Sequence, residues 1–195
     1  KKHPKANEMM PEEYAELILR VVDKEFEHME NKLSAALRSG LFITCFSETN
    51  KSILMWSHYA ANHTGFCIEY DFSKLSIKDP RKRLLYPVIY NDNIFDATEY
   101  LRPTFENKEF NNLMISYAAM NKSEEWNYER EWRYILPYGP TKEVLTMKVP
   151  KPVAVYLGAR ISDENKRKII ELGKSKGFEV FQMAMENSRF NLTST

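Results

Sequence analysis

The chain has 195 residues, a formal net charge of +1 and 43% hydrophobic residues. This length and composition fit one folded domain with a sizeable core, and the balanced charge argues against a general nucleic-acid-binding protein. Only six glycines occur, and no two of them are separated by a single residue. That spacing excludes the G-x-G-x-x-G dinucleotide fingerprint and the G-x-x-x-x-G-K phosphate loop, because both need clustered glycines.

The pattern of apolar residues predicts an α+β fold with a mixed, mainly antiparallel sheet, flanking helices and a long N-terminal helix. We expect one domain over residues 1–195, with a helical arm at 11–39 and an α+β core at 41–185. Pro11 suits the first turn of the arm, and Gly40 is expected to cap its end. Further helices are predicted at 51–61, 94–122 (broken near Pro103) and 163–175. Strands are predicted at 41–46, 66–72, 84–90, 132–136, 144–149, 153–157 and 178–183.

The two cysteines, Cys45 and Cys67, are too few for a disulfide framework. Both lie in apolar runs, which predicts that they are small core residues. No stretch approaches the roughly 20 apolar residues of a membrane span, and the N-terminal segment is charged and amphipathic instead of an apolar signal core. These features predict a reduced, cytoplasmic protein without a membrane partner.

Chemistry-bearing residues gather in three clusters, of which the first is Cys45-Phe46-Ser47-Glu48. It ends a predicted strand, where side chains become free to face a ligand. Ser47 or Asn50 also suits the cap of the following helix, and we favour that interpretation over a catalytic one.

The second cluster is Leu54-Met55-Trp56-Ser57-His58-Tyr59-Ala60, followed by His63 and Gly65. On a helix Trp56, Tyr59 and His63 share one face, and for Trp56 and Tyr59 this spacing is more typical of an aromatic core than of a binding site. A metal site built from His58, His63 and Cys67 lacks a fourth ligand at recognisable spacing, so none is predicted.

The third cluster, Trp126 to Tyr134, is the densest. If it enters a strand, Glu129, Glu131 and Arg133 project from one face. Two close carboxylates raise one another's pKa, whereas an adjacent guanidinium lowers it. Such a group suits acid–base work or the stabilisation of a cation, but a surface ion-pair ladder explains the pattern equally well.

Together the three clusters resemble a bacterial domain-of-unknown-function family that includes abortive-infection (AbiGi-like) phage-defence proteins. The resemblance covers residues 41–160 and includes the late segment Val155-Tyr156-Leu157-Gly158. Family members usually begin with a Tyr-rich strand and an Asn-Asp-Pro-Phe-like turn. Neither occurs here, which implies that an N-terminal portion of the family domain is missing from this chain.

The family is in turn similar to the ADP-ribosyltransferase fold, which arranges a first-strand His or Arg, a middle Tyr or Ser and a late Glu around NAD. Glu131 or Glu129 matches the late Glu, Tyr59 or Ser47 is a poorer match to the middle residue, and the first-strand residue has no counterpart. The resemblance implies NAD as a possible substrate and no certain cofactor. The candidate catalytic residues are Glu131, Glu129, Tyr59 and His58, and the candidate NAD-binding residues are Ser47, Trp56, Trp126 and Arg133.

Two functions follow as hypotheses. One is an ADP-ribosyltransferase-like enzyme that modifies a macromolecular target, with Glu131 acting electrostatically and Glu129 supporting it. The other is a non-enzymatic ligand-sensing or protein-interaction module, in which the amphipathic helix at 11–39 contacts a partner or forms a homo-oligomer. Single-stranded nucleic-acid binding through aromatic residues is a weaker hypothesis, because the net charge is close to zero.

Overall fold

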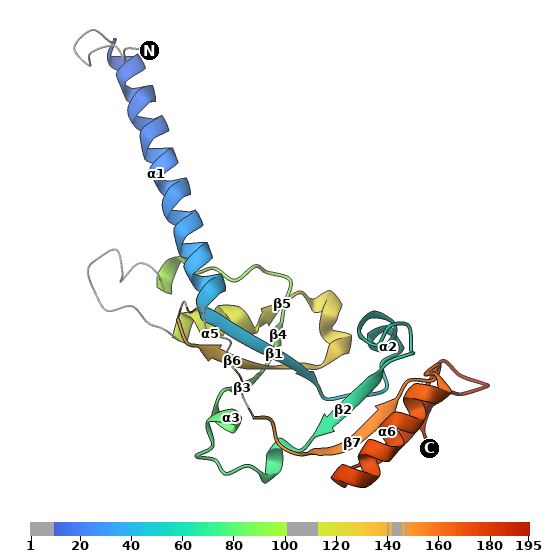
Figure 1. The fold of residues 1–195 in the computed structure, drawn as a ribbon. Helices are drawn as coiled ribbons and strands as arrows, with labels where there is room; N and C mark the ends of the chain where they lie inside the picture. Colours follow the sequence, from blue (N-terminus) through green and yellow to red (C-terminus); the bar gives the residue numbers. More distant parts are fainter. Residues whose placement is uncertain (1–9, 101–112, 140, 142–145, 147) are drawn as a thin grey trace. The chain divides into compact units, whose positions relative to one another are not determined.

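The computed structural model describes residues 10–100, 113–139, 141, 146 and 148–195 (Figure 1). The chain divides into two compact units. The first comprises Lys1–Phe42 and Pro137–Glu143, and the second comprises Ile43–Leu136 and Val144–Thr195. All the site residues discussed below belong to the second unit. The α+β class and the mixed, mainly antiparallel pairing of the strands agree with the sequence-based prediction.

The first unit is dominated by helix α1 (Pro11–Gly40), which confirms the predicted helix. Its first turn carries acidic residues and its last turn an arginine, as the helix dipole favours. The expected glycine cap does not form. Gly40 is the last helical residue, Leu41 is already extended, and the Gly40 carbonyl accepts the N–H groups of Tyr138 and Gly139, both at 3.0 Å.

One sheet has the strand order β1-β6-β3, with β1 at Leu41–Ser47, β6 at Glu131–Pro137 and β3 at Leu85–Pro87. Strands β3 and β6 are antiparallel, and Tyr86 pairs with Arg133. The single strand predicted at 84–90 is divided into two. Buried Val88, which follows β3, donates its N–H to the Glu131 carbonyl. The next two residues form β4 (Ile89–Tyr90), which pairs in parallel with β5 (Asn121–Lys122).

A second sheet has the order β2-β7-β8-β9, and β2 lies at its edge. Its strands are β2 (Phe66–Tyr70), β7 (Pro152–Leu157), β8 (Glu179–Met185) and β9 (Leu192–Ser194). Strand β7 pairs antiparallel with β2 and parallel with β8. Strand β9, which the sequence pattern did not predict, is three residues long and is anchored by fully buried Leu192.

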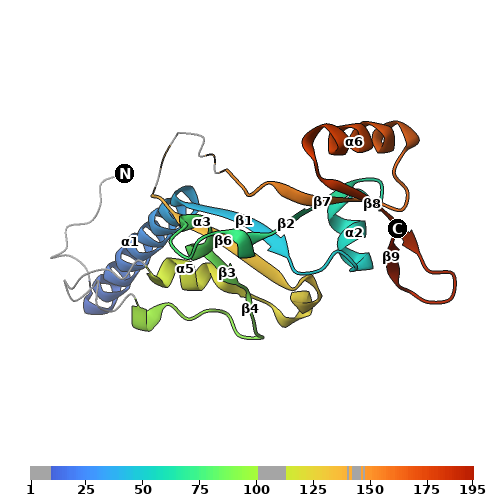
Figure 2. The same cartoon turned by 90° about the horizontal axis from the view of Figure 1, so that it is seen from below.

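Two helices cover the two faces of this second sheet (Figure 2). Helix α2 (Ile53–Tyr59) packs Trp56 against Met183 and Leu192, with Cys67 and Tyr156 at the margin of this core. Helix α6 (Asp163–Lys176) approaches β8 closely, because a Cβ on Gly173 would lie 2.7 Å from the Val180 side chain. Apolar residues on both faces explain why the central strand β7 reads as a nearly continuous hydrophobic run.

A tight connection joins α2 to β2 and requires unusual backbone conformations. Ala61, Asn62 and His63 all have positive φ angles, between 47° and 68°. The turn lies against Gly158, where an added Cβ would come 2.2 Å from the His63 carbonyl oxygen. A side chain at Gly158 would therefore displace the turn that positions α2.

The remaining elements are short. They are η2 (Phe72–Lys74), α3 (Pro80–Arg83), α5 (Leu113–Met120) and η3 (Glu124–Glu129). Only part of the helical region predicted at 94–122 can be assessed, because Pro103 and Phe110 lie outside the described residues. The same is true of the strand predicted at 144–149, whose positions 144, 145 and 147 lie outside them. Lys148 and Val149, at the end of that prediction, are not in a strand. Among the described residues, no helix combines the length and apolarity that a membrane span needs.

Candidate functional site

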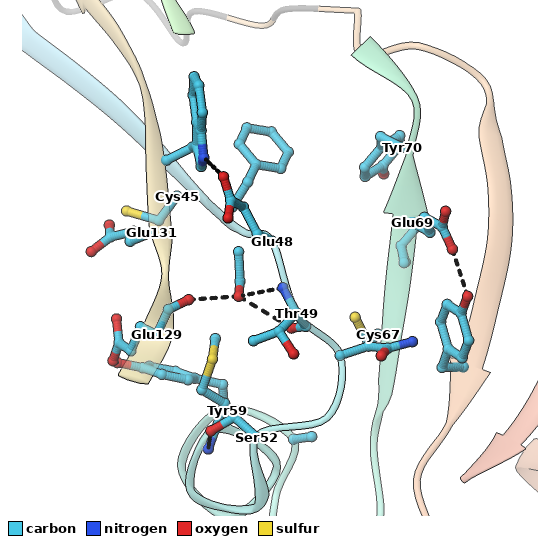
Figure 3. Close-up of a pocket in the computed structure, with 18 of the residues that line it drawn as sticks. Cys45, Glu48, Thr49, Ser52, Tyr59, Cys67, Glu69, Tyr70, Glu129 and Glu131 are labelled. Carbon is cyan, nitrogen blue, oxygen red and sulfur yellow. Dashed lines mark hydrogen bonds between the residues drawn. The ribbon is translucent and has the colours of Figure 1, made fainter. Parts of the chain in front are cut away.

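A cavity of about 990 Å³ opens in the second unit, between the end of β1, helix α2, strand β2 and the start of β6 (Figure 3). We call it the cleft. Its walls are rich in aromatic residues, and it takes in residues from all three clusters that the sequence singled out. Phe46 of β1 meets the rings of Tyr70 and Phe72, with centroids 6.2 and 5.1 Å away, and so connects the two sheets at one end of the cleft.

Four charged side chains form a buried group at the start of β6, which we call the charge cluster: Lys122, Glu129, Glu131 and Arg133. The Lys122 ammonium lies between the two carboxylates, 2.5 Å from Glu129 Oε2 and 2.9 Å from Glu131 Oε2. Arg133 donates from Nε and Nη2 to the two oxygens of Glu131, at 2.8 and 3.1 Å. Glu129 and Glu131 are only 3% and 5% exposed, so this is an internal ion-pair network and not the surface ladder considered from sequence.

The backbone explains how the two glutamates come together. The prediction that Glu129 shares a strand with Glu131 is wrong, because Glu129 ends the 3₁₀ helix η3. Arg130 then adopts a left-handed conformation, with φ 48° and ψ 53°, and the strand starts only at Glu131. A second backbone contact fixes Glu131, whose N–H donates to Tyr90 Oη at 2.8 Å. The prediction that Glu131 and Arg133 are same-face neighbours is confirmed.

The charges of the cluster stabilise one another in their ionised forms. Burial on its own would raise the pKa of Glu131, but hydrogen bonds from Arg133, Cys45 and Lys122 outweigh it and lower the pKa to about 2. Burial likewise opposes the charge on Lys122, and its contacts with Glu129 and Glu131 leave its pKa raised overall. Glu131 is thus held as an anion whose two oxygens are already occupied by cations.

Glu129 is bound differently, because one of its oxygens meets the cleft wall. Tyr59, from the last turn of α2, donates its hydroxyl to Glu129 Oε1 at 2.7 Å. That hydrogen bond, with burial and the charge of Glu129 as smaller causes, raises the pKa of Tyr59 to about 12. Tyr59 therefore remains a neutral donor at physiological pH, and the pair joins α2 to the charge cluster.

Cys45 of β1 lies beside Glu131 (Figure 3). Burial of the thiol, followed by its hydrogen bond to Glu131 and the charge of that carboxylate, raises the pKa of Cys45 to about 11. The prediction that Cys45 is a core residue is nevertheless wrong, because the residue as a whole is exposed. Cys67 is partly buried and packs against the α2 core, in line with its prediction.

The other candidate residues have more separate positions. Trp56 lines the cleft, although it is largely buried in the core, and donates its indole N–H to the Asn50 carbonyl at 2.6 Å. Trp126 lies outside the cleft, with Lys122 Nζ 5.0 Å from its ring centroid. His58 is exposed and does not line the cleft; its ring stands 6.3 Å from that of Tyr59. Sequence reasoning therefore grouped His58 with neighbours that the fold separates from it.

Ser47 and Asn50 do not cap the helix, contrary to the favoured interpretation. Ser52 is the cap and accepts the Met55 N–H at 3.3 Å. Ser47 instead donates its hydroxyl to the Glu129 carbonyl at 2.6 Å, so it holds the end of β1 against the turn that precedes β6.

Lys122 is the site residue that the sequence analysis missed. It lies at the end of a helical pattern and outside the Trp126–Tyr134 cluster, so nothing in its immediate neighbours marks it. The only available signal was the need for a cation near two carboxylates that were expected to be close together. Pairing of β4 with β5 brings Lys122 beside Tyr90 and hence beside Glu131.

Among the described residues, no group of three or more His, Cys, Asp and Glu side chains is arranged to hold a metal ion. His63 contacts its own neighbourhood, with Nε2 3.3 Å from Ser57 Oγ and its ring stacked on Trp56, while its buried Nδ1 has no hydrogen-bond partner among the described residues. The residues assembled in the cleft therefore offer charge stabilisation by fixed carboxylates and binding by aromatic surfaces.

Comparison with known proteins gives one informative result. Searches of the curated proteins and of the solved structures found no significant match. The segment 55–134 runs from α2 into β6 and carries Tyr59 and the whole charge cluster. That segment matches a family model described as a protein of unknown function, DUF2971, which supports the resemblance to a domain family of unknown function.

Proposed function

We propose that the protein is a glycosyl-transfer enzyme of the ADP-ribosyltransferase kind, which uses NAD as donor substrate and modifies a macromolecule in phage defence or a related stress response. The observation that carries the proposal is the Tyr59–Glu129 pair, a buried carboxylate oriented by a hydroxyl at the wall of an aromatic cleft. The two free cysteines favour a reducing, cytoplasmic location.

Cleavage of the bond between nicotinamide and ribose is favoured by such a carboxylate. When the bond between the nicotinamide nitrogen and the ribose carbon breaks, its electron pair leaves with nicotinamide, and positive charge develops on the ribose. A carboxylate held in place before the reaction stabilises that charge without reorganising. In this proposal Glu129 acts on the ribose, Tyr59 positions it, and Glu131 supports it through Lys122. Both oxygens of Glu131 are bound to cations, whereas the partner of Glu129 Oε1 is the neutral Tyr59 hydroxyl.

Part of the NAD molecule fits the cleft. The cationic nicotinamide end suits a lining that holds four glutamates, one lysine and one arginine, together with aromatic rings. The diphosphate fits less well. Among the described residues of the lining, the two cations are Lys122 and Arg133, and both are paired with carboxylates. We therefore assign only the nicotinamide–ribose end to the cleft, with the diphosphate outside it.

The test is release of nicotinamide from labelled NAD in the presence of candidate macromolecular targets. We expect Glu129→Gln to lower the rate by about 100-fold, since removal of one fixed electrostatic group at a reacting centre costs that much. Glu125→Gln is the matched control, because Glu125 is an exposed acid of the same short helix, and it should change the rate less than twofold. Absence of release, or equal rates for Glu129→Gln and the wild type, would overturn the proposal.

The second candidate is a non-enzymatic ligand-sensing or interaction module, and it is favoured by the saturation of Glu131. An apolar stripe on α1 supports an interaction role, since Tyr14, Leu17, Ile18 and Val21 are each more than 40% exposed. If this function is correct, the protein does not turn over NAD, and α1 forms a homo-oligomer or binds a partner protein. Light scattering of the wild type and of a Leu17→Glu/Val21→Glu variant tests it: a monomer in both cases would contradict the homo-oligomer.

A further inference from the structure

Strand β2 forms a second wall of the cleft, and within the described part of the chain its backbone there has no partner strand. It is an edge strand, paired with β7 on one side only. All five of its residues, Phe66 to Tyr70, line the cleft. Side chains of successive strand residues point to opposite faces, so a cavity that touches every residue of the strand borders its edge.

The register identifies which backbone groups point into the cleft. Gly158 donates its N–H to the Gly65 carbonyl at 2.9 Å, and Phe66 pairs with Leu157 in the same register. Hydrogen-bonded and non-hydrogen-bonded pairs alternate along an antiparallel ladder. Cys67 and Glu69 therefore turn their backbone groups toward β7, whereas Phe66 and Ile68 turn their N–H and C=O groups away from it.

The outward groups are accessible. Phe66 is 52% and Ile68 39% exposed, and the described residues give their backbone groups no hydrogen-bond partner on the side away from β7. An irregularity in the pairing between Glu69 and Tyr70 ends the regular edge. This leaves a stretch from Phe66 to Glu69 that can pair with about as many residues of an added strand.

The charges beside this edge favour a basic partner. Counted over the residues that the structure describes, the cleft lining contains four carboxylates and two cations, and both cations belong to the charge cluster. The carboxylates left over are Glu69 on β2 and Glu48 after β1. Glu69 accepts the Tyr156 hydroxyl at 2.6 Å, and Glu48 accepts the Trp132 indole N–H at 2.6 Å with exposed Arg130 3.6 Å away. Within the described residues, no cation lies at ion-pair distance from Glu69.

We propose that the free edge of β2 binds an extended, basic polypeptide segment by strand addition, so that its backbone pairs with Phe66 and Ile68 and its basic side chains face Glu69 and Glu48. Main-chain hydrogen bonds supply affinity in this mode, and alternate side chains supply specificity. Apolar residues of the segment would share a face with Phe66 and Ile68, and basic residues would share the face of Glu69. This binding does not depend on glycosyl transfer.

The experiment measures fluorescence anisotropy of a labelled heptapeptide, Lys-Val-Arg-Val-Lys-Val-Arg, with the wild-type protein. Three control peptides have the same length. One replaces every basic residue with Glu, and the other two carry N-methyl groups on alternate backbone nitrogens, at odd or at even positions, so that each blocks pairing along one edge of the peptide. We expect measurable binding of the basic peptide, at least tenfold weaker binding of the Glu peptide and of one N-methylated peptide, and normal binding of the N-methylated peptide whose methyl groups face away from β2.

Protein variants locate the binding edge. Ile68→Pro removes an outward N–H that is not part of the β2–β7 ladder, which an edge strand tolerates, and it should weaken binding at least tenfold while circular dichroism stays unchanged. Glu69→Gln should weaken it about threefold or more. Glu129→Gln should bind normally even if it has lost turnover, which separates this proposal from the catalytic one. If the basic peptide does not bind, or binds no better than the Glu peptide, or if neither N-methylated peptide binds more weakly, strand addition to β2 is overturned.

Discussion

The charge cluster and the free edge of β2 line the same cleft but satisfy their polar groups in opposite ways. In the charge cluster every carboxylate oxygen has a partner within 3.1 Å, and its two glutamates are almost fully buried. Along the β2 edge, alternate backbone groups point into an open cavity. Buried charges that lose one partner are costly, whereas solvated edge groups are free to exchange water for a ligand. The cluster is therefore expected to fix the cleft, and the edge to receive a ligand.

The largest expected effect comes from removing the cation that holds the cluster together. Lys122→Met leaves Glu129 and Glu131 facing each other in a buried site without the bridging ammonium. Breaking such a buried pair costs about 3–5 kcal/mol of unfolding free energy, which urea denaturation at pH 7 measures. Lys51→Met is the matched control, because Lys51 is exposed, and it should change stability by less than about 0.5 kcal/mol.

A double variant sharpens the same prediction. Combining Lys122→Met with Glu129→Gln removes one of the two repelling charges, so part of the lost stability should return. The recovered free energy is the coupling between the two residues. A loss below about 1 kcal/mol in Lys122→Met alone would mean that water solvates the cluster and that it does not fix the cleft.

Acid titration is expected to weaken the cluster next. The pKa of Glu131 falls from its ordinary 4.5 to about 2 in the folded protein. A lowered folded-state pKa contributes stability that is complete above about 4.5 and is lost as the pH falls toward 2, amounting to about 3 kcal/mol at most. Urea denaturation at pH 7, 4 and 3 should show this loss in the wild type. Glu131→Gln should start less stable and lose less over the same range; parallel curves would contradict the assigned pKa.

Loss of the Tyr59 hydroxyl should have a smaller effect. Tyr59→Phe removes one hydrogen bond to Glu129, and Tyr59 is 65% exposed, so water can replace the donor. We expect a loss of about 1 kcal/mol, compared with no loss for Tyr138→Phe, which changes another exposed tyrosine. Nuclear magnetic resonance of ring-labelled tyrosine should also lose one signal that titrates near pH 12.

Much of the fold could be predicted from local patterns, whereas the site depended on contacts between distant segments. Helix α1 has strong helical periodicity, and strands β1 and β7 are short apolar runs. These elements and β8 formed close to their predicted bounds. The strand predicted at 84–90 was divided because the choice of partner for each half is a tertiary effect. Periodicity says nothing about such pairings.

The same distinction explains the outcome for the candidate residues. Glu131 and Arg133 are two residues apart in a strand, so their contact followed from local geometry. The contact of Lys122 with Glu131 depends on the parallel pairing of β4 with β5. The contact of Ser47 with Glu129 depends on the position of the end of β1 beside the start of β6. His58 was grouped with Tyr59 by sequence proximity, but one residue along a short helix turns it out of the cleft.

The smallest effect concerns Cys45, whose thiol reports on the charge cluster from β1. With Cys67 replaced by Ser, the rate of iodoacetamide labelling follows the thiolate of Cys45 alone. The rate should keep rising until about pH 11, beyond the ordinary range of a free thiol. Burial is the main cause of the raised pKa, and Glu131 the second, so Glu131→Gln should move the profile only part of the way back. If the profile of Glu131→Gln matches that of the wild type, burial alone raises the pKa of Cys45. If the wild type itself shows the profile of an ordinary free thiol, Cys45 is solvated and lies apart from the charge cluster, as the backbone groups of the β2 edge do.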